Sequence, residues 1–94
     1  MRSFRADPQT YAARQDAHNV LDMIWKQAPP ERRDAARSAV YRWLSDKMHI
    51  TRKACHIALF DISQCRQVIE YCRGRKLEDL WTYRALDRYL RVAK

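Results

Sequence analysis

Two histidines, an aspartate and an arginine are the side chains with which this sequence could perform acid–base or metal chemistry. His18 and Asp22 are four residues apart, so on a helix they lie one turn from each other and could share a hydrogen bond. His56, next to Cys55, could approach them in the fold. Together with Arg14 these residues define a candidate polar cluster, which could hold a divalent cation or transfer protons. Its members are Arg14, His18, Asp22 and His56.

Nothing else in the sequence completes a catalytic site. There is no glycine-rich loop that would cradle a phosphate, no nucleophile elbow and no pair of carboxylates at catalytic spacing. A single histidine on a helix commonly hydrogen-bonds a backbone carbonyl or a carboxylate. We therefore predict that the protein is not an enzyme and has no catalytic residues.

The three cysteines do not have the spacing of a zinc site. Structural zinc takes four Cys or His ligands, usually in closely spaced pairs, whereas Cys55, Cys65 and Cys72 form no such pair. Cys65 and Cys72 are two helical turns apart, which is too far to share one ion easily. We expect buried, small apolar side chains, with no metal and no cofactor. An odd number of cysteines and no signal peptide indicate the reducing cytoplasm.

The formal charge of +8 and a pI of about 9.9 predict attraction to an acidic partner. Nucleic acid is the leading interpretation, because a pI above ~9 is its usual electrostatic signature. An acidic protein surface and an anionic membrane are the other candidates, and excess arginine that only aids solubility remains an alternative. No apolar run is long enough to span a membrane.

The placement of glycine and proline predicts an all-α fold. One glycine and three prolines in 94 residues are too few for the turns of a small β protein. Asp7-Pro8 and Pro29-Pro30 are helix starts, Asp61 with Gln64 resembles a capping box, and Gly74 suits a helix end. We expect one domain over residues 1–94, a compact bundle of four to five helices behind a short disordered N-terminus, 1–6. The predicted helices cover 8–26, 30–47, 51–59, 62–73 and 77–92.

Arginine and lysine rows on these helices and turns are the candidate nucleic-acid contacts. Arg84, Arg88 and Arg91 follow one helical face at i, i+4 and i+7. The predicted contact residues are Arg66, Arg73, Arg75, Lys76, Arg84, Arg88 and Arg91. A helix-turn-helix-like unit over 41–72 is a second interpretation; the other is two core helices with polar outer faces. Trp25, Trp43 and Trp81 lie on apolar stripes, which favours core packing over base stacking.

Three stretches together resemble a known family. They are residues 14–26, residues 39–44 and residues 55–69, with Cys55-His56 at the start of the third. Over about residues 10–70 they resemble the C-terminal half of a zinc-finger-containing domain family common in phages and prophages, without its N-terminal cysteine cluster. The resemblance implies a helical scaffold and a phage or mobile-element origin, but neither zinc nor an activity. The matching residues are Arg14, His18, Asp22, Trp25, Tyr41, Trp43, Cys55, His56, Asp61 and Cys65.

Three functions remain open from the sequence. The first is a small basic protein that binds nucleic acid or a nucleic-acid-handling complex. The alternative is a non-catalytic inhibitor or adaptor that binds a host defence or replication complex. The third is a metal-dependent enzyme that uses His18, Asp22 and His56. The oligomeric state is left open, with a dimer as one option.

Overall fold

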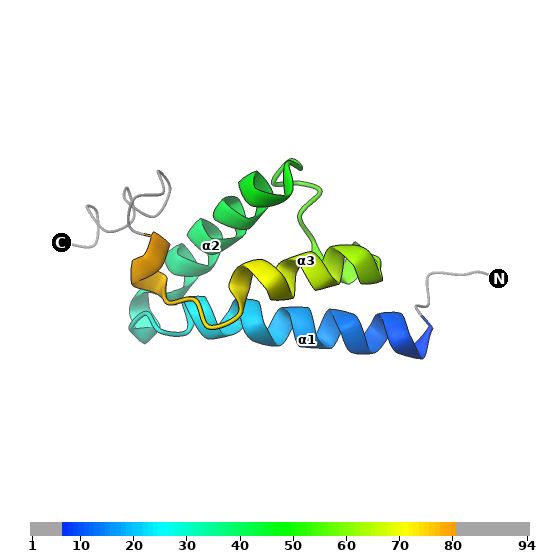
Figure 1. The fold of residues 1–94 in the computed structure, drawn as a ribbon. Helices are drawn as coiled ribbons and strands as arrows, with labels where there is room; N and C mark the ends of the chain where they lie inside the picture. The colour runs from blue at the N-terminus through cyan, green and yellow to red at the C-terminus, as the bar shows by residue number, and fades with distance from the viewer. Residues whose placement is uncertain (1–6, 81–94) are drawn as a thin grey trace.

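The computed structural model of the chain describes residues 7–80, and these residues form an all-helical fold (Figure 1). No β-strand occurs within this range, so the predicted fold class is confirmed. The α-helices are α1 (Pro8–Trp25), α2 (Arg33–Met48) and α3 (Ile62–Cys72). Three short 3-10 turns accompany them: η1 (Pro30–Arg32), η2 (Ile57–Leu59) and η3 (Leu77–Leu80).

The expected count of four to five helices is not confirmed over residues 7–80, which hold three. The predicted brief helix over 51–59 is replaced by turns and η2. Its buried side chains, Cys55, Ile57 and Phe60, are two and three residues apart, and a regular helix would not bring all three to one face. The predicted helix over 77–92 starts as η3, and the rest of it lies outside the described residues, as does the predicted disordered segment 1–6.

Local sequence signals explain where α1 and α3 begin. The Asp7 carboxylate accepts a hydrogen bond from the Thr10 backbone N–H at 2.7 Å, and Pro8 occupies the first turn. At α3 the predicted capping box is present. Asp61 Oδ1 accepts from the Gln64 N–H at 2.8 Å, while Gln64 Oε1 accepts from the Asp61 N–H at 3.1 Å. Both helix starts are therefore set by residues within one turn of each other.

The core lies where α1 packs along α3 and α2 crosses obliquely over them (Figure 1). α1 contributes Ala17, Leu21 and Ile24, which follow one face at i, i+4 and i+7 and are fully buried. The segment between α2 and α3 fills the space between the three helices with its own buried side chains. None of the helices in the 7–80 range is long and apolar enough to cross a lipid bilayer.

The connection between α2 and α3 does not have the form of a helix-turn-helix motif. Thirteen residues separate Met48 from Ile62, whereas that motif uses a turn of three or four. On α3, the Gln64 side chain is occupied by the capping box. The polar residues Ser63, Arg66 and Gln67 are exposed, so they lie on the outer face of a helix whose other face is in the core.

One long-range hydrogen bond ties the middle of α1 to the start of α3. Arg14 Nε donates to the Phe60 carbonyl oxygen at 2.8 Å, across 46 residues of sequence. Phe60 directly precedes the residue that caps α3 and is itself buried. Arg14 therefore holds the entry to α3 against α1.

We expect Arg14→Ala to lower the free energy of unfolding by about 2 kcal/mol, because hydrogen bonds to charged groups contribute ~1.5–3 kcal/mol. Urea denaturation followed by circular dichroism measures this change. Arg66→Ala, on the exposed face of α3, is the matched control and should stay within ~0.5 kcal/mol of the unmodified protein. Equal effects of the two substitutions would show that the Phe60 bond does not stabilise the fold.

Candidate functional site

The segment that follows α3 is held against the end of α1 by Gln27. Gln27 Oε1 accepts from the Leu77 backbone N–H at 3.0 Å, and Gln27 Nε2 lies 3.4 Å from the Arg75 carbonyl oxygen. Gly74, with φ of +69°, turns the chain out of α3 in a conformation that favours glycine. The backbone on both sides of Arg75 is thereby fixed.

The Arg75 side chain lies over the indole of Trp43 on α2. Its guanidinium carbon is 5.4 Å from the ring centroid, within the range of a cation–π contact. Arg75 Nε also donates to the Tyr71 carbonyl oxygen at 2.8 Å, which fixes the orientation of the guanidinium plane. Arg75 therefore bridges α2 and the last turn of α3.

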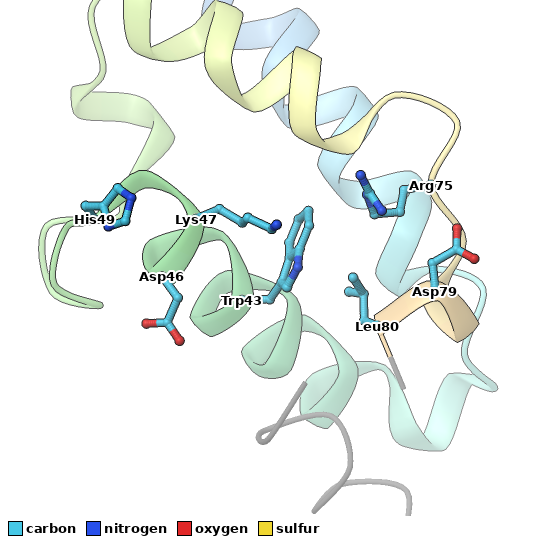
Figure 2. Close-up of a pocket in the computed structure, with 7 residues that line it drawn as sticks. All are labelled: Trp43, Asp46, Lys47, His49, Arg75, Asp79 and Leu80. Atoms are coloured by element: carbon cyan, nitrogen blue, oxygen red, sulfur yellow. The ribbon is translucent and has the colours of Figure 1, made fainter. Parts of the chain in front are cut away.

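An open pocket of about 560 Å³ lies beside this contact, between α2 and the segment that follows α3 (Figure 2). We call it the Trp43 pocket. Trp43 is 5 % exposed, and in Figure 2 its ring stands between the side chains of Lys47 and Arg75. The pocket is lined by Trp43, Asp46, Lys47, His49, Arg75, Asp79 and Leu80.

The two cations of the Trp43 pocket lie beside the Trp43 ring. Figure 2 shows the Lys47 ammonium and the Arg75 guanidinium on either side of the indole, with the Asp46 carboxylate directed away from them. Asp79 lies at the far rim, and its Oδ2 accepts from the Lys76 backbone N–H at 2.9 Å. Because the indole stands between the two cations, each of them can contact an anion on its own side of the ring.

His49 closes α2 in the left-handed conformation, with φ of +58°. Among the non-glycine residues of the 7–80 segment, it alone has a positive φ. This conformation costs roughly 1–2 kcal/mol for a residue with a Cβ. Non-glycine residues held in such conformations cluster at functional sites, and His49 lines the Trp43 pocket.

We expect His49→Gly to raise the free energy of unfolding by about 1 kcal/mol, because glycine adopts this conformation without a Cβ clash. Thermal denaturation followed by circular dichroism is the measurement. His49→Ala, which keeps the Cβ, is the control and should not be stabilising. A lower melting temperature for His49→Gly than for His49→Ala would contradict the interpretation of strain.

The residues predicted to contact nucleic acid fall into two groups. Arg66 is exposed on α3, and Arg73, Arg75 and Lys76 are exposed just after it; of these four, Arg75 lines the Trp43 pocket. The others, Arg84, Arg88 and Arg91, lie outside the described residues. Residues 7–80 carry thirteen Lys and Arg against ten Asp and Glu, so most of the +8 surplus belongs to positions 1–6 and 81–94 of the sequence. Within 7–80 the net positive charge is small, so attraction of an anion there depends on where individual Lys and Arg side chains lie.

The four residues of the candidate polar cluster have different surroundings. Arg14 bonds Phe60, as described above, and Asp22 Oδ1 accepts from Trp25 Nε1 at 2.8 Å. His18 is half-buried on α1, and His56 is exposed. Among residues 7–80 there is no group of three or more His, Cys, Asp or Glu side chains placed to hold a metal ion.

All three cysteines are buried as unpaired thiols. Burial raises the pKa of each, and raises that of Cys72 to about 12 from a usual 9.0. Cys55 Sγ contacts the Tyr41 carbonyl oxygen at 3.8 Å. These environments favour the neutral thiol over the thiolate.

Sequence reasoning did not select Trp43, Lys47 or His49 as site residues. It assigned Trp43 to the core. A signal was available, since Trp43 and Lys47 are one helical turn apart and lie on the same side of α2. The missing information was that Arg75 approaches the same ring from the segment after α3.

A small helical domain with an open pocket beside a tryptophan, lined by two cations and two carboxylates, is the class of protein that these observations define. A family model described as a zinc-finger-containing domain matches residues 3–75. Because the match covers well over half of the chain, the protein belongs to this family. Searches of curated proteins and of solved structures give no match.

The match corrects the resemblance drawn from the sequence. The chain was expected to correspond to the C-terminal half of the family, without the cysteine cluster, over about residues 10–70. The match instead starts at residue 3, covers the N-terminal part of the chain and includes all three cysteines. The expectation was wrong because it relied on short motifs from Arg14 onward and treated the missing early cysteines as a missing half.

The residues described do not fit the zinc ion that the family description implies. Zinc is bound by thiolates and neutral imidazoles, usually four in number. Cys55, Cys65 and Cys72 are buried in the apolar core with raised pKa values, and His56, next to Cys55, is exposed. No chemistry of residues 7–80 is therefore assigned to zinc.

Proposed function

We propose that this protein binds nucleic acid through its phosphate backbone, without catalysis, and that the Trp43 pocket is a contact site. The supporting observation is the placement of the Lys47 ammonium and the Arg75 guanidinium on either side of one indole in an open pocket. Lysine and arginine are the usual partners of nucleic-acid phosphates. The family description is compatible with such binding.

The neighbouring charges extend this contact surface. Arg73 and Lys76 are exposed on either side of Arg75 in the same short segment. A backbone passing the pocket would meet several cations within a few residues of chain. The segment is also anchored to α1 by Gln27, so little of its backbone would need to be ordered on binding.

The burial of the Trp43 ring favours contacts with phosphates over recognition of bases. The ring is almost fully buried, and the Arg75 guanidinium lies over it. A base could stack on this ring only after displacing Arg75. We therefore propose binding with little sequence preference, in contrast to readout of base edges in a groove.

Fluorescence anisotropy with labelled single-stranded DNA, duplex DNA and RNA, in a series of salt concentrations, tests the proposal. Each phosphate contact contributes about 0.7–0.9 to the slope of log affinity against log salt. We expect binding at low salt, a clearly negative slope, and similar affinities for unrelated sequences of one nucleic-acid type. Absence of binding at low salt, or an affinity that does not change with salt, would overturn the proposal.

A further inference from the structure

A second pair of cations surrounds Tyr41, away from the Trp43 pocket. The guanidinium carbons of Arg37 and Arg52 are each 4.9 Å from the centroid of the Tyr41 ring. Arg37 comes from α2, whereas Arg52 comes from the turn after it. Since both contact one ring, their charged groups are within about 10 Å of each other.

These two guanidinium groups keep their hydrogen-bonding capacity. A guanidinium that stacks on a ring uses its flat face, and its five N–H donors remain in the plane. Across the described part of the chain, no acceptor or carboxylate partner is found for Arg37 or Arg52. The Asp22 carboxylate lies close enough to raise the pKa of Tyr41, and its Oδ1 accepts from Trp25 Nε1.

The ring between the two cations is part of the rigid core. Tyr41 is 4 % exposed, and its backbone oxygen contacts the buried Cys55 thiol. Burial is the main cause of its raised pKa. No group within 7–80 hydrogen-bonds the Tyr41 hydroxyl. The ring therefore holds two solvent-accessible cations near each other, and an anion that contacts both would reduce their mutual repulsion.

We infer that Arg37 and Arg52, positioned by the Tyr41 ring, bind a phosphate group. We call this the Arg37–Arg52 site. Phosphate is the anion that fits best, since its oxygens can accept from the planar donors of both guanidinium groups. This inference rests on the proposed function, because the phosphate is taken to belong to the same nucleic-acid backbone that contacts the Trp43 pocket.

The geometry of α2 determines where the Arg37–Arg52 site lies relative to the Trp43 pocket. Tyr41 and Trp43 are two residues apart, which places them about 200° apart around the helix axis. The Arg37–Arg52 site and the Trp43 pocket therefore lie on opposite sides of α2, separated by one helix diameter of ~10 Å. A nucleic-acid backbone that crosses α2 would place different phosphates at the two sites.

The test compares the double variant Arg37→Gln/Arg52→Gln with Lys53→Gln, an exposed neighbour in the same turn with no ring contact assigned to it. Anisotropy titrations with a labelled oligonucleotide are run over a range of salt concentrations for both. For the double variant we expect about tenfold weaker binding and a salt slope smaller by about one. Lys53→Gln should stay within about twofold of the unmodified protein. Circular dichroism confirms that each variant folds.

Failure of this inference and failure of the proposed function give different results. If the unmodified protein binds nucleic acid with a negative salt slope, but the double variant matches Lys53→Gln, the Arg37–Arg52 site is overturned alone. If the unmodified protein binds no nucleic acid, inorganic phosphate is titrated while the arginine Nε–H resonances are followed by NMR. Saturable shifts of Arg37 and Arg52 would then support a phosphate site that serves another phosphate ligand, and unchanged resonances would overturn it.

Discussion

Replacing Lys47 and Arg75 together by alanine should weaken nucleic-acid binding about 100-fold at moderate salt. A hydrogen bond to a charged group contributes roughly 1.5 kcal/mol or more, which is about tenfold in affinity for each cation. The slope of log affinity against log salt should also become smaller by about 1.5, since two phosphate contacts are lost. Anisotropy titrations of the single and double variants measure both effects.

Two controls separate lost contacts from lost structure. Lys53→Ala removes the same charge from an exposed position in the turn after α2 and should change affinity by less than about twofold. Arg75→Lys keeps the charge but loses the planar stacking on Trp43, so its affinity should lie between those of Arg75→Ala and the unmodified protein. If Lys53→Ala weakens binding as much as Lys47→Ala does, binding follows net charge and not the Trp43 pocket.

The native thiols should be almost unreactive toward a disulfide reagent at pH 8. The thiolate is the reactive form, and a pKa of about 12 for Cys72, against a usual 9.0, lowers its thiolate fraction about 1000-fold at that pH. All three thiols are also buried. We expect three thiols to react rapidly in denaturant, and only at the rate of unfolding in its absence.

The same measurement tests for zinc. A zinc chelator should leave the native reaction rate and the helical circular dichroism signal unchanged, because residues 7–80 offer no fitting zinc site. Were Cys55, Cys65 and Cys72 zinc ligands, the chelator would release the ion, unfold the core and speed the reaction. Rapid reaction of the three native thiols, with or without chelator, would contradict their assignment as buried core residues.

The parts of the fold that the sequence predicts well are those decided within a few residues. Asp7-Pro8 starts α1, and Asp61 with Gln64 caps α3, because each cap is a contact within one turn. The buried residues of α1, Ala17, Leu21 and Ile24, also follow the 3.6-residue period that is readable in the sequence, whereas Tyr11, on the same expected stripe, is exposed. Segment 51–59 lacks such a period. Its irregular backbone depends on which of its side chains, such as Cys55 and Ile57, are buried in the core.

The candidate site depends on contacts between distant segments. Lys47 and Arg75 are 28 positions apart in the sequence, and nothing local to either residue indicates that they line the same pocket. Arg37 and Arg52 likewise come from different elements. Charge composition predicted an anionic partner, but the positions of the cations around aromatic rings required the folded chain.

Chemical-shift mapping by NMR shows directly which residues contact nucleic acid. A short oligonucleotide is added to the ¹⁵N-labelled protein at low salt, and the Trp43 indole N–H and the backbone amides are followed. We expect saturable shifts that concentrate at Trp43, Lys47, His49 and the segment around Arg75. Shifts confined to α1, or none at these residues despite binding, would contradict the assignment of the Trp43 pocket as a nucleic-acid contact site.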